Sequence, residues 1–155
     1  DNLQMIQDFG QLFNKRTEAQ KWIDKINFAY QDFQQFINDK PIKKAAYFIW
    51  ANPHMVAGNH TFINELLKLN HFENIYESKE GRYPETELKK IRLEGDPDYV
   101  FLSSEPFPFK DEHAFEIGRF THHAKTVFVD GEMFSWYGSR LLKAFDYFKL
   151  LHSRI

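Results

Sequence analysis

The sequence contains no cysteine, so disulfide bonds, thiolate metal sites and cysteine nucleophiles are excluded. It has no apolar run of about 18 residues, and we therefore expect no segment that spans a membrane. Its 20 Lys and Arg nearly balance its 22 Asp and Glu, which gives no electrostatic case for binding nucleic acid or an anionic membrane. A signal peptide and an initiator methionine are also missing, so we expect a mature fragment or an excised domain.

The motifs of common enzymes are missing as well. There is no GxSxG elbow, no glycine-rich phosphate loop and no HExxH helix. Ser103, Ser104 and Glu105 could be combined with a distant histidine as a catalytic triad, but a sequence with 7 histidines allows many such combinations. We therefore expect no catalytic residues and no enzyme.

Aromatic residues are abundant, with 17 Phe, 7 Tyr and 3 Trp among 155 residues. Most of these rings must lie in the core, because each buries a large apolar area. The surplus leaves an aromatic-lined cleft as the alternative. The length suits one well-buried domain better than two.

Apolar spacing predicts alternating helices and strands, and hence an α/β layered domain with a mostly parallel sheet. A long helix over residues 16–39 ends before Pro41. Further helices are predicted over 2–13, 85–93, 111–120 and 139–152. Another begins after a cap at Asn59 or Thr61, with Phe62, Ile63, Leu66 and Leu67 facing inward. In the helix over 111–120 the inward residues are Ala114, Phe115 and Ile117. The predicted strands cover 45–50, 74–77, 99–103 and 126–129.

Distinctive side chains follow three of these strands. They are Trp50 and His54, then Glu105, Phe107 and Phe109, then Trp136, Tyr137 and Arg140. Because parallel strands end at one edge of the sheet, these residues are expected to share that edge. They predict a cleft with much aromatic surface and one or two cations. Arg140 could bind a carboxylate, phosphate or propionate there, or merely pair with an acidic neighbour.

Two histidine positions invite a metal interpretation. His122 and His123 are adjacent, but neighbouring residues of an extended segment point to opposite sides and no carboxylate sits at a helpful spacing. We therefore favour a solvated loop and expect no metal site. His54, in the loop after the first strand, is the better candidate for contact with a ligand.

An ordered set of motifs resembles one family. The set is WANPHMVAGNHTFINELL at 50–67, Asn74-Ile75, Tyr83-Pro84, the Asp96-Pro97-Asp98 turn and VDGEMFSWYGSRLL at 129–142. It is similar to the helical-backbone, class III substrate-binding proteins of ABC importers for cobalamin, ferric siderophores or haem, over roughly residues 41–152. The resemblance implies a three-layer Rossmann-like lobe with a mostly parallel sheet, preceded by a long linking α-helix.

The same resemblance implies a domain plan and a set of contacts. Residues 1–15 would be the remnant of an N-terminal lobe, 16–40 the linking helix and 41–155 the C-terminal ligand-binding lobe. Trp50, His54, Tyr83, Phe107, Phe109, Trp136, Tyr137 and Arg140 would contact the ligand. The permease would dock on an acidic residue, but Lys89 stands at the expected offset, so Glu85 and Glu87 are the candidates.

The implied function is ligand capture and delivery to a permease, with no intrinsic cofactor. The location would be the periplasm, or the outer face of the inner membrane through a lipid anchor. An exposed half-cleft would favour a dimer and leave this chain alone a weak binder. The alternative is a metal-linked chelatase-like enzyme or sensor on the same α/β lobe.

Overall fold

The computed structural model describes residue 4 and residues 16–135 and 140–155. The chain forms two compact units, residues 41–135 and residues 1–40 together with 136–155. The predicted domain limits place the last helix with the sheet, whereas these units group it with the long helix. The assignment of 1–15 to another lobe stays a prediction. Within the described residues, no helix is long and apolar enough to cross a membrane.

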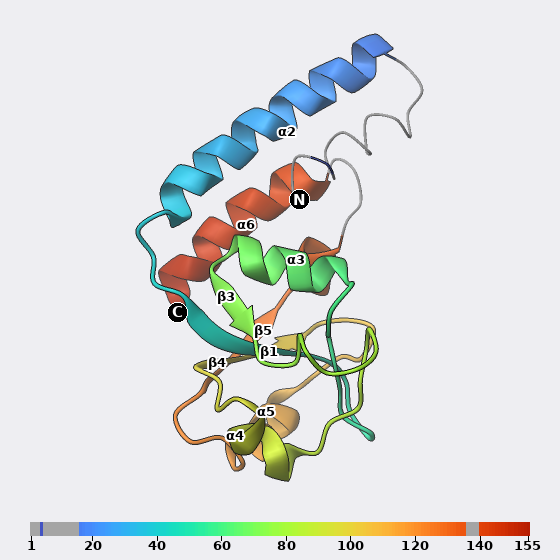
Figure 1. Ribbon diagram of the computed structural model, residues 1–155, viewed down its shortest axis with the longest axis vertical. Helices are drawn as coiled ribbons and strands as arrows, with labels where there is room; N and C mark the ends of the chain where they lie inside the picture. The colour runs from blue at the N-terminus through green and yellow to red at the C-terminus, as the bar shows by residue number, and fades with distance from the viewer. Residues whose placement is uncertain (1–3, 5–15, 136–139) are drawn as a thin grey trace. The chain divides into compact units, whose positions relative to one another are not determined.

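The helical unit contains α2 (Arg16–Ile37) and α6 (Arg140–Arg154). Phe33 is fully buried, and its ring lies 5.6 Å from Phe145 and 6.0 Å from Phe148. Farther along both helices, Phe36 contacts His152 at 6.0 Å between ring centroids. Since the contacts advance in the same direction on both helices, α2 and α6 run parallel (Figure 1). The helices predicted over 16–39 and 139–152 are thus confirmed, whereas the one over 2–13 falls on residues that, Gln4 apart, lie outside the described part.

The other unit is built on a five-stranded sheet with the order β2-β1-β4-β5. Its strands are β1 (Lys43–Trp50), β2 (Met55–Val56), β3 (Phe72–Asn74), β4 (Tyr99–Ser103) and β5 (Lys125–Val129). β3 and β4 pair with β1 in parallel and β5 pairs with β4 in parallel, whereas β2 turns back antiparallel to the end of β1. The predicted α/β fold with a mostly parallel sheet is confirmed.

Helices cover both faces of this sheet (Figure 1), with α3 (Phe62–Leu69) on one side and α4 (Ile91–Glu94) and α5 (Asp111–Gly118) on the other. Burial on both sides explains why β1 is apolar over consecutive residues. Tyr47 packs on Phe134 at 5.0 Å between ring centroids. Phe48, with its side chain on the opposite face, belongs to a core cluster with Ile91 and Ile117. The three layers are those expected of a Rossmann-like lobe.

Asn74 ties three segments of this unit together beneath α3. Its Nδ2 donates to the Ala57 carbonyl at 2.9 Å and to Asn64 Oδ1 at 3.0 Å, and its Oδ1 accepts from the Tyr76 backbone N–H at 3.0 Å. Asn64 and Asn74 are buried. Because an unpaired buried polar group costs about 1–3 kcal/mol, this network resists replacement of any one member.

Several local predictions were wrong. The helix predicted over 85–93 is a short 3₁₀ turn, η1 (Leu88–Lys90), followed by α4, since the residues before it pair with β2 instead. Phe62 and Phe115 do not face inward, with 46% and 76% of their surface exposed. Thr61, one of the two proposed caps, does cap α3, because its side chain accepts from the Asn64 N–H. The short strand predicted over 74–77 ends at Asn74.

Candidate functional site

The ends of β1 and β4 bring two predicted ligand-binding side chains together. Trp50 is the last residue of β1, and Phe107 lies in the loop after β4. Their rings meet edge to face with centroids 5.4 Å apart. Trp50 keeps 39% of its surface exposed. The sheet edge therefore presents an exposed aromatic surface, the Trp50 ring, which the Phe107 ring supports from behind.

The ring contacts continue through Phe109 to the start of α5. Phe107 lies 4.8 Å from Phe109 and 4.9 Å from His113, again edge to face. Phe109 is buried, and the His113 Nδ1 accepts from the Lys110 backbone N–H at 2.9 Å. We call Trp50, Phe107, Phe109 and His113 the aromatic cluster. Sequence reasoning missed His113, although it occupies the first turn of a predicted helix directly after the two phenylalanines.

His54 packs from the β1–β2 loop with its ring edge-on to Phe48, the centroids being 5.9 Å apart. Burial lowers the pKa of His54, the Glu116 carboxylate partly opposes this and the charge of His113 adds to it. The imidazole is thus favoured in its neutral form, in which one ring nitrogen keeps a lone pair.

Tyr83 lies on a segment that extends the sheet beyond β2. The Gly58 N–H donates to the Arg82 carbonyl at 2.7 Å and the Val56 N–H to the Pro84 carbonyl at 3.1 Å. Tyr83 is 40% exposed, and the Arg82 guanidinium lies over its ring at 5.9 Å. A Cβ on Gly58 would come within 2.8 Å of the Gly81 carbonyl oxygen, so this close pairing requires glycine. Within the described part of the chain, the Tyr83 ring makes no ring contact with the aromatic cluster.

The docking candidates are on the surface but not on a helix. Glu85 forms an antiparallel bridge with Met55, and its side chain is exposed. Glu87 Oε2 lies 3.3 Å from the Lys89 Nζ. A basic residue therefore shields one of the two carboxylates. Their role in docking stays a prediction.

The third predicted group is described only in part. Trp136 and Tyr137 lie outside the described residues, and Arg140 is the exposed first residue of α6 in the helical unit. Glu105, the remaining residue at the predicted sheet edge, is exposed after β4. The participation of Trp136, Tyr137 and Arg140 in a ligand site stays a prediction.

A cavity of about 560 Å³ lies in the unit that holds the sheet. Its lining is mostly polar and consists of Lys44, Asn59, Glu73, Asn74, Ile75, Glu77, Ser78, Glu94 and Gly95. Its lining includes none of the described residues that the sequence predicted to bind a ligand.

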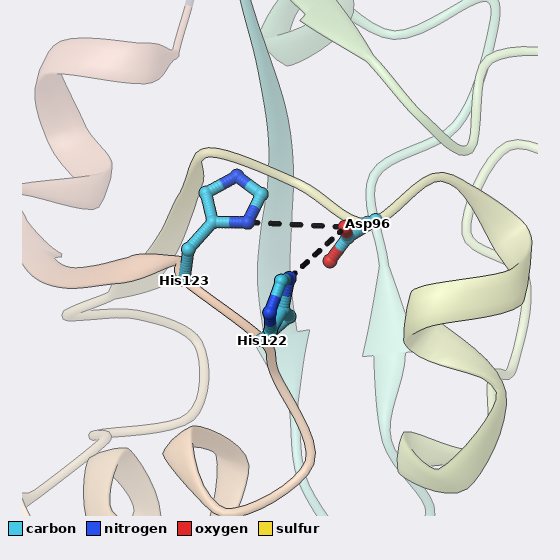
Figure 2. Close-up of side chains that lie close together, drawn as sticks. All are labelled: Asp96, His122 and His123. Carbon is cyan, nitrogen blue, oxygen red and sulfur yellow. Dashed lines mark ion pairs between the residues drawn. The ribbon is translucent and has the colours of Figure 1, made fainter.

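The sequence had indicated a solvated loop at His122 and His123. Both side chains are exposed, but they are not surrounded by solvent alone. Asp96 lies beside both His122 and His123 (Figure 2), because the loops before β4 and β5 meet at one edge of the sheet. No carboxylate stands at a helpful spacing from the histidines in the sequence, but the fold brings Asp96 to them. The pairing of two parallel strands was the signal that could have found it.

A family-level sequence model described as periplasmic binding protein matches residues 1–126. The chain is also similar to solved structures. The vitamin B12 binding protein BtuF of Vibrio cholerae is 13% identical with a TM-score of 0.79, over 99% of this chain and 63% of that one. IsdE of S. aureus, complexed with heme, is 18% identical with a TM-score of 0.72, over 96% and 62%. The heme binding protein HutB of Vibrio cholerae is 18% identical with a TM-score of 0.70, over 92% and 59%.

The chain thus spans less than two thirds of the length of these structures. At such identities they establish the fold. A search of curated protein sequences gave no significant match.

Proposed function

The chain belongs to the periplasmic binding protein family, and on this premise we propose that it is part of the substrate-binding component of an ABC importer. Its ligand would be cobalamin, haem or a ferric siderophore, captured and then delivered to a permease. The proposed location is the periplasm, with or without a lipid anchor. The similar structures are named as binding proteins, and we propose no catalytic activity.

The observation that carries this proposal is the exposed edge of the aromatic cluster. Trp50 is supported from behind by Phe107, which packs in turn on His113. A flat macrocycle or an apolar chelate gains affinity from burial against such rings, and rigid rings lose little conformational entropy on binding. The cluster is held by strand ends and a helix start, so the surface is preformed.

His54 offers a way to distinguish among the three ligands. A neutral imidazole can ligate the iron of haem, and burial favours that form here. Cobalamin and a fully chelated ferric siderophore need no such ligand from the protein. A loss of affinity for haem alone on removing His54 would favour haem.

We propose the domain plan of the sequence analysis as the reason why this chain would bind weakly by itself. If residues 41–155 with the helix over 16–40 form one lobe, the second wall of the cleft lies in a preceding lobe, of which 1–15 would be the last part. Dimerisation through the exposed half-cleft and docking of a permease at Glu85 or Glu87 belong to the same proposal.

The chelatase-like enzyme or sensor has less support. It would need histidine and carboxylate ligands beside the bound macrocycle. The cluster of Asp96, His122 and His123 lies just before β4 and β5, whereas Trp50 is the last residue of β1 and Phe107 follows β4. These are opposite edges of a parallel sheet.

The proposal is tested by titrating cyanocobalamin, haemin and a ferric siderophore into the chain and into the protein extended upstream to include a first lobe. Tryptophan fluorescence reports binding. We expect saturable binding of one ligand by the extended protein and weak binding by the chain.

Trp50→Ala in the extended protein should weaken binding roughly 10-fold, about 1.4 kcal/mol, whereas Phe115→Ala, on the exposed side of α5, should leave it unchanged. If the extended protein bound none of the three ligands, the proposal would be overturned.

A further inference from the structure

Two loops at the far edge of the sheet bring a carboxylate and two imidazoles together. The Asp96-Pro97-Asp98 turn precedes β4, and His122 and His123 precede β5. β4 and β5 pair in parallel with Tyr99 opposite Lys125. The two loops therefore enter the sheet side by side. They lie at the edge opposite to the aromatic cluster.

The three side chains converge on one point (Figure 2). Asp96 Oδ2 lies 3.8 Å from the His122 Nδ1 and 3.8 Å from the His123 Nδ1. One potential ligand atom from each residue lies within 4.8 Å of the others. Tetrahedral Zn²⁺ with bonds of about 2.0–2.1 Å would hold such atoms roughly 3.3 Å apart. The carboxylate and each imidazole need to approach by about half an ångström, and the two imidazoles by at most about 1.5 Å, which partly exposed side chains can do.

The other ring nitrogen of His123 already has a hydrogen-bond partner. Its Nε2 lies 2.9 Å from Asp98 Oδ1, and an ionised carboxylate can only accept, so Nε2 carries the proton of this bond. In the neutral ring the Nδ1 lone pair then faces the Asp96 carboxylate, which is also an acceptor. Two acceptors face one another favourably only with a cation or a proton between them. A carboxylate behind a histidine is also the usual arrangement that orients a metal ligand.

The surroundings hold both loops in place. The Arg92 side chain donates to the carbonyls of Phe120 at 3.2 Å and Thr121 at 3.0 Å, just before the histidines. The Lys44 backbone N–H donates to Asp98 Oδ2 at 2.9 Å. Asp96 has a positive φ of 50°, and its Oδ1 is buried without a hydrogen-bond partner. Burial of an unsatisfied carboxylate oxygen is costly, and a cation bound at the other oxygen, Oδ2, would offset part of that cost by neutralising the same carboxylate.

We propose that Asp96, His122 and His123 form a binding site for a divalent transition-metal ion of the Zn²⁺ type. In the described part of the chain, they form the one group of three metal-ligating residues whose atoms lie this close. Two imidazole nitrogens and one carboxylate oxygen suit Zn²⁺, whereas Mg²⁺ and Ca²⁺ prefer oxygen ligands. Three protein ligands leave a position for water. Asp98 is a positioning residue that acts through His123.

The site is tested with ZnCl₂ at pH 7.5 by calorimetry and by thermal unfolding of the full chain, in the absence of any macrocycle or chelate. We expect one Zn²⁺ per chain, a higher Tm that EDTA reverses, and no equivalent effect of MgCl₂. Because no transport ligand is present, the result does not depend on the proposed function.

His122→Ala should weaken Zn²⁺ binding at least 10-fold, and the double variant His122→Ala/His123→Ala should abolish it. Asp98→Asn should weaken binding about 10-fold, the lower end for loss of a residue that orients a ligand. The matched control is His60→Asn, because His60 is exposed, stands apart from the cluster and has a positive φ that Asn tolerates. Absence of saturable Zn²⁺ binding, or unchanged binding by the double variant, would overturn the proposal and leave His123 as an ion-pair partner of Asp96 and Asp98.

Discussion

Trp50 and Phe107 meet edge to face, with their ring centroids 5.4 Å apart and their planes at 65°. The contact joins the exit of β1 to the loop that follows β4. Parallel pairing of these strands, with Phe48 opposite Leu102, brings the two exits together. The ring pair therefore depends on the sheet.

The contact should contribute measurably to stability. Aromatic pairs of this geometry contribute about 0.5–1.5 kcal/mol beyond their buried area, so a double-mutant cycle with Trp50→Ala and Phe107→Ala should give a coupling in that range. Urea unfolding of the four proteins measures it. Phe115→Ala, which removes a ring that is 76% exposed, should change the free energy of unfolding by less than about 0.5 kcal/mol. Strict additivity of the two single variants would contradict the contact.

His54 should make the protein less stable in mild acid. Burial lowers its pKa in the folded state, so the unfolded chain takes up the proton first. The contribution of neutral His54 to the free energy of unfolding is present above the pKa of His54 in the unfolded chain, about 6.5. It is lost as the pH falls through that value toward the pKa of His54 in the folded state. Denaturant unfolding between pH 8 and pH 5 should show this loss, and His54→Gln should reduce it.

The influence of Glu116 on His54 can be tested separately. The Glu116 carboxylate raises the pKa of His54 against the effect of burial. Glu116→Gln should therefore lower that pKa further, as followed by the NMR shifts of the imidazole protons. The exposed His60 serves as an internal reference, and a rise in the pKa of His54 would contradict the assignment.

Two glycines should respond in opposite ways to alanine. A Cβ on Gly131 would lie 2.4 Å from Ser103 Oγ and 2.8 Å from Glu105 Cγ, whereas a Cβ on Gly118 would meet nothing within 4 Å. Gly131→Ala should cost about 1–3 kcal/mol through overpacking. Gly118→Ala, at the end of α5, should stabilise by up to about 1 kcal/mol. Thermal unfolding compares them, and equal Tm values would show that the loops after β4 and β5 can separate.

The sheet was predictable because burial on both faces leaves apolar runs that local sequence reveals. Residues 99–103 form a strand with the predicted limits. The helix predicted over 85–93 does not form over its first residues, because their backbone pairs with a segment distant in sequence, which a local pattern does not reveal. The Thr86 N–H donates to the His54 carbonyl, and Glu85 pairs with Met55. Tertiary pairing thus overrode a favourable helical composition.

The candidate site was likewise predictable from the sequence only in part. The meeting of Trp50 with Phe107 follows from strand direction, which the α/β pattern indicated. The meeting of Asp96 with His123 follows from the same rule at the other ends of the strands. It was missed because the search for a carboxylate was confined to positions near the histidines in sequence. His113 was missed because its role depends on ring orientation.

Asn74 also determines how β3 is aligned along β1. A slip of β3 by two residues along β1 would keep the same side-chain face inward and bring Phe72 or Tyr76 to the position of Asn74. Apolar packing alone would discriminate weakly against that slip. The Ala57 carbonyl and Asn64 Oδ1 would both lose their partner, whereas the local bond to the Tyr76 N–H would move with the segment, so the amide selects this register through its two distant partners.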